Sequence, residues 1–322
     1  MEYVGIQTQK KRNNIRSFTL LFLFPILVLA LIFLFYFLLF SLAGKDNLQS
    51  EILTHTFQMT LQSTPYVYVG VAIWFIIAFF ANTSIIKSAT DSHSLSRKEN
   101  KRIYNLVENL CMASGTKMPK INVIEDNSLN AFASGINNRT YTVTLTRGII
   151  NRLDDNELEG VIAHELSHIR NNDVRLLIIS IVFVGIFAMI AQICLKSIRY
   201  MPMRTNSKGK GGGGIIVVIL LLAVVAGIGY FFGTLLRFAI SRKREFLADA
   251  GAAEMTKNPE ALASALRKIS SDPNVESIKR EDVAQLFIEH PGKQAKGFLG
   301  KLGGLFATHP SIKDRIRILE QF

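Results

Sequence analysis

Two histidines and a glutamate in the stretch VIAHELSHIRNND, residues 161–173, have the types and spacing of a metal site. His164 and His168 are four residues apart, so on a helix both imidazoles point to one face and can bind one zinc ion. Glu165 projects from the same helix beside them. The competing interpretation is a pair of histidines that cap or line a helix, because H-E-x-x-H alone is only moderately specific. The pattern therefore predicts a metal site, provided that the chain supplies another ligand.

A catalytic zinc site needs three protein ligands and one open position for water. An H-x-x-G-x-x-H extension of the motif is excluded, because Asn171 and Val174 stand at the required positions. Of the remaining histidines, His55 and His93 fall in a predicted outside loop or near a span. A carboxylate from another helix is therefore the better candidate for the third ligand.

Two such carboxylates, Glu245 and Asp249, lie four residues apart in SRKREFLADAGAA, hence on one face of a predicted helix. One of them can bind the metal while the other accepts the outer N–H of a ligating histidine and fixes its tautomer. The alternative is that both make surface ion pairs with the basic residues 242–244. The spacing alone does not say which acid has which role.

With these residues in place, the chain resembles the HtpX-like membrane zinc metalloproteases. VIAHELSHIRNND matches their HExxH motif with a downstream aspartate, and SRKREFLADAGAA matches their S-R-x-x-E-x-x-A-D-A segment. Residues 130–133 and 308–310 match further motifs of the family in the same order. The resemblance covers nearly the whole chain from the first apolar run onward.

The resemblance implies a zincin-like (gluzincin) α+β catalytic domain with one Zn²⁺ per subunit. His164, His168 and Glu245 would bind this ion, and Asp249 would be the partner of a histidine ligand. The same zinc motifs occur in the prenyl-protein CAAX endopeptidases. The implied activity is that of a quality-control and stress-response protease that cleaves misfolded or damaged membrane proteins.

Ordinary zinc chemistry then predicts the reaction. Zn²⁺ lowers the pKa of its bound water toward about 7 and polarises the scissile carbonyl, while Glu165 takes the water proton and delivers it to the leaving amine. Asn130 and His309 are candidates for substrate binding. The strand at 140–146, or the NAFAS segment just before it, is expected to offer an edge to which an extended peptide substrate is added.

Four apolar runs place this chemistry at a membrane: residues 20–43, 66–86, 174–195 and 215–236. Each has about the 20 residues that a helix needs to cross about 30 Å of hydrocarbon. They account for a hydrophobic content of 49%, which is high for a soluble protein. The first run exceeds a signal-peptide core of about 7–15 residues, so we expect an uncleaved anchor. The chain is therefore predicted to be an α-rich, multi-pass integral membrane protein.

The predicted boundaries follow from these runs. They are a basic cytoplasmic tail (1–16), four transmembrane helices (17–43, 65–86, 174–196 and 215–237), an outside loop (44–64), a Gly-rich loop (197–214) and two parts of the catalytic domain (87–173 and 238–322).

The net charge of +12 favours orientation in a membrane over nucleic-acid binding, because the basic residues gather at span borders without a nucleic-acid motif. The excess of Lys and Arg predicts a cytoplasmic catalytic domain, in a bacterial inner membrane by the family resemblance. The basic loop at 196–214 disagrees; we expect the third and fourth spans to cross, with an incomplete hairpin as the alternative.

Polar patterning between the second and third spans predicts a small sheet packed on helices. Residues 103–111 have helical spacing before Gly115, 121–124 and 140–146 read as strands, and Asp154 with Glu157 begins a further helix. No breaker follows that helix, so it is expected to run, straight or bent, into the third span. A second helix is expected to continue from the fourth span into the soluble part. The stretch 296–311 is either a lid that touches the membrane or a packed loop.

Three other classes of protein compete with this interpretation. A site-2-type protease would carry HExxH within a span, whereas charged residues surround the motif here. A CAAX-type processing enzyme shares the motifs but has more spans. A non-catalytic metal-binding scaffold would use the same residues for binding alone. The expected function is therefore a membrane zinc metalloendopeptidase whose partners are protein or peptide substrates and the lipid bilayer.

Overall fold

The computed structural model describes residues 6–43, 49–200, 212–239, 242–270 and 311–322. It divides into two compact units. The helical unit comprises Phe18–Ala78 and Ile179–Leu236. The other comprises Met1–Ser17, Phe79–Ile178 and Arg237–Phe322, and we call it the site unit because the predicted metal ligands belong to it. Each unit is described by itself.

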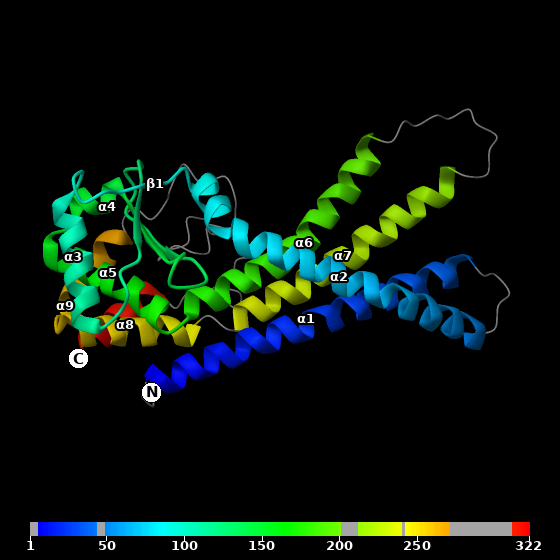
Figure 1. The fold of residues 1–322 in the computed structure, drawn as a ribbon, viewed down its shortest axis with the longest axis horizontal. Coiled ribbons are helices and arrows are strands. Elements are labelled where there is room, and N and C mark those ends of the chain that lie inside the picture. Colours follow the sequence, from blue (N-terminus) through cyan, green and yellow to red (C-terminus); the bar gives the residue numbers. More distant parts are fainter. Residues whose placement is uncertain (1–5, 44–48, 201–211, 240–241, 271–310) are drawn as a thin grey trace. The chain divides into compact units, whose positions relative to one another are not determined.

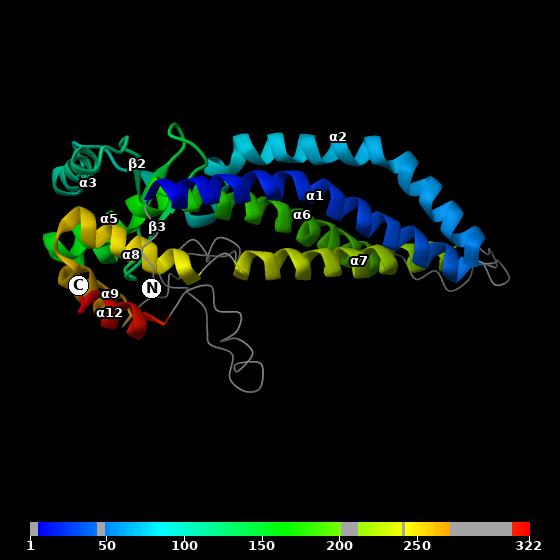
Figure 2. The same cartoon turned by 90° about the horizontal axis from the view of Figure 1, so that it is seen from below.

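Four long helices supply the helical unit: α1 (Ile6–Ala43), α2 (Gln49–Thr90), α6 (Asp173–Tyr200) and α7 (Gly212–Ala239). Within this unit they lie side by side (Figure 1, Figure 2). Among the described residues, the stretches long and apolar enough to cross a membrane are Lys10–Ala43, Gln49–Ser84, Asp173–Tyr200 and Gly214–Thr234. The four predicted membrane helices are thus confirmed.

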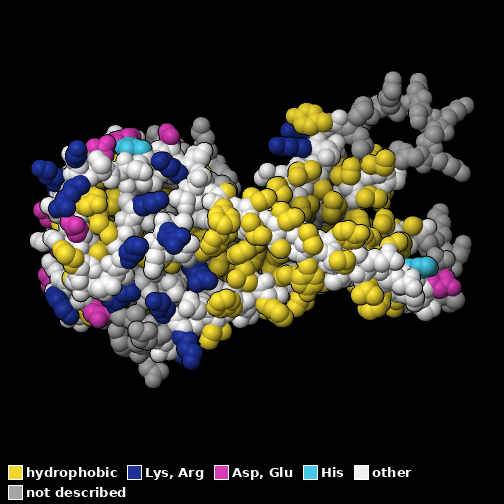
Figure 3. Space-filling view, in the orientation of Figure 1, with side chains coloured by type: hydrophobic (Ala, Val, Ile, Leu, Met, Phe, Trp, Pro, Cys, Tyr) yellow, Lys and Arg dark blue, Asp and Glu magenta, His cyan; other side chains and the backbone are white. Residues whose placement is uncertain are grey.

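Aromatic contacts join the helices of this unit. Phe24 of α1 stacks on Phe183 of α6 with ring centroids 4.0 Å apart. The indole of Trp74 in α2 donates to the backbone carbonyl of Val182 at 3.1 Å. Large apolar side chains also face outward, such as Phe22 at 76% exposure, and hydrophobic side chains dominate the visible face of these helices (Figure 3). An exposed apolar belt of this kind suits contact with lipid.

The site unit contains a four-stranded mixed sheet with the order β1-β2-β4-β3. Its strands are β1 (His93–Ser94), β2 (Lys120–Ile124), β3 (Ala131–Ser134) and β4 (Thr142–Thr146). β2 and β4 pair in parallel, whereas β1 with β2 and β3 with β4 pair antiparallel. The strands predicted at 121–124 and 140–146 correspond to β2 and β4. Within the described part of the chain, the NAFAS segment forms the edge strand β3.

Six helices lie wholly within the described part of the site unit: α3 (Lys101–Ser114), α4 (Arg147–Arg152), α5 (Asp155–Arg170), α8 (Arg242–Thr256), α9 (Pro259–Ile269) and α12 (Ile312–Leu319). α3 ends, as its sequence predicts, at Gly115 in the left-handed conformation with φ +63°. α5 packs against α3, α8, α9 and β3. The helix with the H-E-x-x-H motif is therefore the centre of the site unit.

Both ends of α5 are fixed by polar side chains. At its start Asp154 and Glu157 form the predicted capping box, with each side chain accepting from the other's backbone N–H at 2.9 and 3.0 Å. At its end the prediction of a helix running on into the third span is wrong. α5 stops at Arg170, Asn172 has a left-handed φ of +60°, and α6 begins at Asp173. Asn adopts this conformation more readily than most residues, so it breaks the helix without a Gly or Pro.

Candidate metal centre and active site

α5 presents the two histidines on one face. The Nε2 atoms of His164 and His168 are 3.2 Å apart, and the rings meet edge to face with centroids 4.7 Å apart. His164 is buried and His168 is partly exposed. The spacing of four residues has thus brought two imidazole nitrogens to one point, as the helix period requires.

α8 brings a carboxylate to the same point. Glu245 Oε2 lies 3.5 Å from His164 Nε2, and Glu245 Oε1 lies 3.6 Å from His168 Nε2. The three residues each offer a ligand atom within 4.8 Å of the others. In a tetrahedral zinc site with bonds of about 2.0–2.1 Å, ligand atoms lie about 3.3 Å apart. The two Nε2 atoms are spaced for a zinc-sized ion, and each lies within 3.6 Å of one oxygen of Glu245.

Small side chains allow α8 to approach α5 this closely. Ala248 and Ala252 are fully buried, and a Cβ placed on Gly251 would come within 2.6 Å of the Ser167 hydroxyl oxygen on α5. The Ala- and Gly-rich sequence of α8 therefore sets the helix separation that lets Glu245 reach the two histidines.

Asp249 holds the outer nitrogen of His164. Its Oδ1 lies 2.9 Å from His164 Nδ1, and its side chain is buried. If His164 Nδ1 carries the proton, Nε2 faces the other two ligand atoms with its lone pair. The structure thus brings Glu245 to the two histidines and Asp249 to the far nitrogen of His164, while their roles as ligand and partner stay predictions.

His168 has its own carboxylate partner, which the sequence interpretation did not assign. Asp173 Oδ2 lies 3.1 Å from His168 Nδ1, and Asp173 is buried at the first position of α6. The signal in the sequence was an acidic residue five positions after the histidine, but its usefulness depends on the break at Asn172. A continuous helix would turn position 173 to another face.

Arg315 is a second site residue that sequence reasoning missed. It is 1% exposed and forms a bidentate ion pair with Asp249, with Nε to Oδ2 at 2.9 Å and Nη2 to Oδ1 at 2.7 Å. Its Nη1 lies 3.6 Å from Glu245 Oε2. The available signal was an arginine four positions before the buried Leu319, on the apolar stripe of a short amphipathic helix.

These contacts shift the protonation of the buried groups. Burial raises the pKa of Asp249, but the Arg315 guanidinium and the His164 ring together hold that pKa below its usual value. Burial and Arg315 lower the pKa of His164, but its bonds to the two carboxylates of α8 outweigh them and raise it to about 9.

Glu165 is buried on α5 next to His164, one of the predicted metal ligands. Burial raises the pKa of this carboxyl, while the charges of the two histidines lower it. The backbone N–H of Ala133 in β3 donates to it. A buried carboxylate with a raised pKa is suited to take and return a proton near neutral pH.

The two predicted substrate-binding residues are not brought together by the described structure. Asn130 is fully buried at the start of β3, where its side-chain oxygen accepts from the N–H of Ala131 at 3.0 Å. His309 lies outside the described residues, as does all of the predicted lid except Ser311. Both assignments stay predictions.

This chain is similar to the model of a protein family, to proteases of two bacteria and to a solved structure. Residues 97–322 match the model of Peptidase family M48. A protease HtpX homolog of Bacteroides fragilis is 65% identical over 323 residues, which cover 100% of each chain. A protease HtpX homolog of Dictyoglomus thermophilum is 40% identical over 259 residues, covering 78% of this chain and 81% of the relative. Among solved structures, the crystal structure of S. mikatae Ste24p is similar with a TM-score of 0.46 and 19% identity, covering 97% of this chain and 66% of that chain.

Proposed function

Because the chain belongs to Peptidase family M48 and is a membrane metalloprotease, we propose that it is a zinc endopeptidase that cuts misfolded or damaged membrane proteins at the cytoplasmic face. The observation that carries the proposal is the convergence of His164, His168 and Glu245 from two helices, with Glu165 beside them. Each step of the proposal concerns a different part of the molecule.

The donor set favours zinc. Two imidazole nitrogens and one carboxylate oxygen, with room for one more ligand, are typical of catalytic zinc sites. When bound, the ion would polarise the scissile carbonyl and lower the pKa of a coordinated water toward about 7. The distance of 3.2 Å between the two Nε2 atoms, and a Glu245 oxygen within 3.6 Å of each of them, support an ion of this size.

The protein's own groups orient the ligands and move the proton. Asp249 and Asp173 each accept from the Nδ1 side of one histidine, so both rings present Nε2 to the centre. Glu165 would take a proton from the attacking water and give it to the leaving amine, which is why its buried carboxylate must be unprotonated at the start of the cycle.

The edge strand β3 favours a peptide as the substrate. β3 is the terminal strand of the sheet in the described part of the chain, and its Ala133 is hydrogen-bonded to the proposed base. An extended peptide added to β3 would run past Glu165, as in other cases of strand addition. Such binding needs a locally unfolded segment, because a helix or a folded loop cannot pair with a strand along its backbone.

Two features support membrane proteins as the substrates and the cytoplasm as the side of cleavage. The four membrane-capable helices keep the enzyme in the bilayer, so membrane proteins reach it by lateral diffusion. The excess of Lys and Arg at one set of span borders favours a cytoplasmic site unit under the positive-inside rule.

The test is cleavage in proteoliposomes that contain the full chain with zinc. An unfolded membrane protein, the same protein folded, and a prenylated CAAX peptide are compared as substrates for the wild type and for Glu165→Gln. We expect the wild type to cut the unfolded membrane protein and Glu165→Gln to cut none of the three. Glu159→Gln on the same helix is the matched control and should cleave like the wild type.

Cleavage of the CAAX peptide alone would make the chain a processing enzyme. Tight zinc binding without any cleavage would make it a metal-binding scaffold.

A further inference from the structure

Near the start of α1, Asn13 is a buried polar residue among exposed neighbours. Asn13 is 0% exposed, whereas Lys11, Arg12, Ile15 and Arg16 around it in α1 are exposed. A short polar side chain that is fully buried needs hydrogen-bond partners, because leaving its amide unpaired costs about 1–3 kcal/mol. Its partners therefore reveal what this segment is built to contact.

Those partners are at the break between α5 and α6. The amide nitrogen of Asn13 donates to the backbone carbonyl of Asn171 at 2.9 Å and to Asp173 Oδ1 at 2.6 Å. Both partner atoms are acceptors only, so the orientation of the amide is set by chemistry. Asn13 is thus hydrogen-bonded to the two residues that flank Asn172, which has the left-handed conformation.

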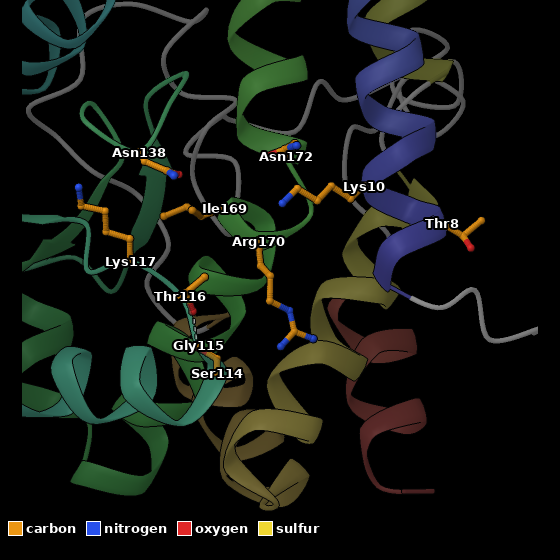
Figure 4. Close-up of a pocket in the computed structure, with 10 residues that line it drawn as sticks. All are labelled: Thr8, Lys10, Ser114, Gly115, Thr116, Lys117, Asn138, Ile169, Arg170 and Asn172. Carbon is orange, nitrogen blue, oxygen red and sulfur yellow. Dashed lines mark hydrogen bonds between the residues drawn. The ribbon is translucent and has the colours of Figure 1, made fainter.

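A neighbouring contact strengthens this attachment. Asn172 Nδ2 donates to the side-chain oxygen of Asn14 at 2.9 Å. Figure 4 shows Asn172 and Lys10 extending from the two elements toward the same pocket, with Ile169 and Arg170 at the end of α5 beside them. The start of α1 and the end of α5 therefore form one packed junction within the site unit.

Asp173 connects this junction to a predicted metal ligand. One of its carboxylate oxygens faces Asn13, and the other lies 3.1 Å from His168 Nδ1. Arg244, buried beside it, donates to the backbone carbonyl of Asp173 at 3.3 Å and attracts its charge. Because each carboxylate oxygen has its own partner, rotating the carboxylate about its bond would break both contacts.

We propose that Asn13 is a positioning residue of the metal centre: it holds the Asp173 carboxylate in the plane that orients His168 for metal binding. The inference rests on the proposed function only in taking His168 as a ligand. Asp173 follows a break in the helix, so the regular backbone of α5 does not fix its direction, and Asn13 supplies that constraint from a segment far away in the sequence. The start of α1 is then part of the enzyme's metal site as well as a basic border that sets orientation.

Asn13→Asp is the sharpest test, because aspartate has nearly the shape of asparagine. It removes the donor and places a second carboxylate against Asp173, so the positioning role predicts a larger loss than for Asn13→Ala. A role in packing alone predicts the reverse order. Asn14→Asp is the matched control one position along, because Asn14 accepts from Asn172 and aspartate can still accept.

The measurement is the zinc affinity of the full chain purified in detergent, obtained by competition with a chromophoric chelator. Partners of ligating histidines typically contribute 10–100-fold in metal affinity, and we expect Asn13→Asp to lose about tenfold and Asn14→Asp to stay within about twofold. Thermal unfolding of each variant without zinc shows whether the fold is retained.

A double-mutant cycle keeps the inference testable if one variant is poorly stable. If Asn13 acts through Asp173, Asn13→Ala changes zinc affinity much less in an Asp173→Asn background than in the wild type. Equal effects in both backgrounds, or an unchanged affinity in Asn13→Asp, would overturn the inference. If the wild type itself bound no zinc, the proposed function would fail instead, so the two failures are distinguishable.

Discussion

Removing the Asp249 carboxylate should damage both the fold and the metal site. Asp249 accepts two hydrogen bonds from Arg315 and lies 2.9 Å from His164 Nδ1. Asp249→Ala leaves the Arg315 guanidinium, 1% exposed, without its bidentate partner. Breaking a buried ion pair from one side costs about 3–5 kcal/mol. At about 2–4 °C per kcal/mol for domains of this size, the melting temperature should fall by about 6–20 °C.

Metal binding should weaken for two reasons. The loss of the histidine's partner costs about 10–100-fold in affinity. In addition, Arg315 Nη1 already lies 3.6 Å from Glu245 Oε2, and a guanidinium without Asp249 would pair with this ligand and compete with the ion. We therefore expect the zinc affinity of Asp249→Ala to fall at the upper end of that range.

Thermal unfolding followed by circular dichroism, together with zinc competition in detergent, measures both effects. Glu254→Ala on the same helix is the control: its side chain is 47% exposed and pairs with Arg170 at 3.1 Å, so its loss should cost less than about 1 kcal/mol. The double variant Asp249→Ala with Arg315→Met should recover stability and the part of the zinc affinity lost to competition by Arg315, but not the part lost with the partner of His164. A melting temperature of Asp249→Ala equal to that of Glu254→Ala, or no recovery in the double variant, would refute the reasoning.

Three further predictions concern separate parts of the site unit. Asp154→Ala removes the capping box with Glu157 and should lower the stability by about 1 kcal/mol in thermal unfolding while leaving zinc affinity unchanged; a changed affinity would contradict it. Gly148→Ala places a Cβ 2.0 Å from the backbone carbonyl oxygen of Asn127, so it should cost at least about 1–3 kcal/mol by the same assay, and a wild-type melting temperature would disprove the close approach. Treatment with a chelator should abolish peptide cleavage and added zinc should restore it; cleavage that persists in metal-free protein would rule out a catalytic metal.

Local sequence signals predicted the parts of this fold that depend on neighbouring residues. The apolar runs predicted the four membrane helices, and Asp154 with Glu157 predicted the start of α5. The spacing of the two histidines placed them on one face because a helix has a fixed period. The end of α5 was missed because it depends on the left-handed conformation of Asn172. An asparagine can adopt this conformation but does not require it, so the sequence does not predict the break.

Local sequence signals did not predict the contacts between segments that are distant in the chain. The spacing of Glu245 and Asp249 left their roles open, and only the family resemblance assigned them. Arg315 and Asn13 were missed, because each is buried by elements far away in the chain: α5 and α8 for the arginine, and the α5–α6 break for the asparagine. A polar residue on an otherwise apolar or exposed face is ambiguous until its partner is known.

We infer that Glu165 moves the proton while Glu245 binds the metal. Zinc content and peptide cleavage are measured in parallel for the wild type, Glu165→Gln and Glu245→Gln. Glu165→Gln should keep one equivalent of zinc and lose about 10²–10⁴-fold in cleavage rate, as expected for removal of a general base. Glu245→Gln should lose zinc and activity together. Cleavage by Glu165→Gln at the wild-type rate, or loss of zinc from that variant instead of from Glu245→Gln, would rule out these two roles.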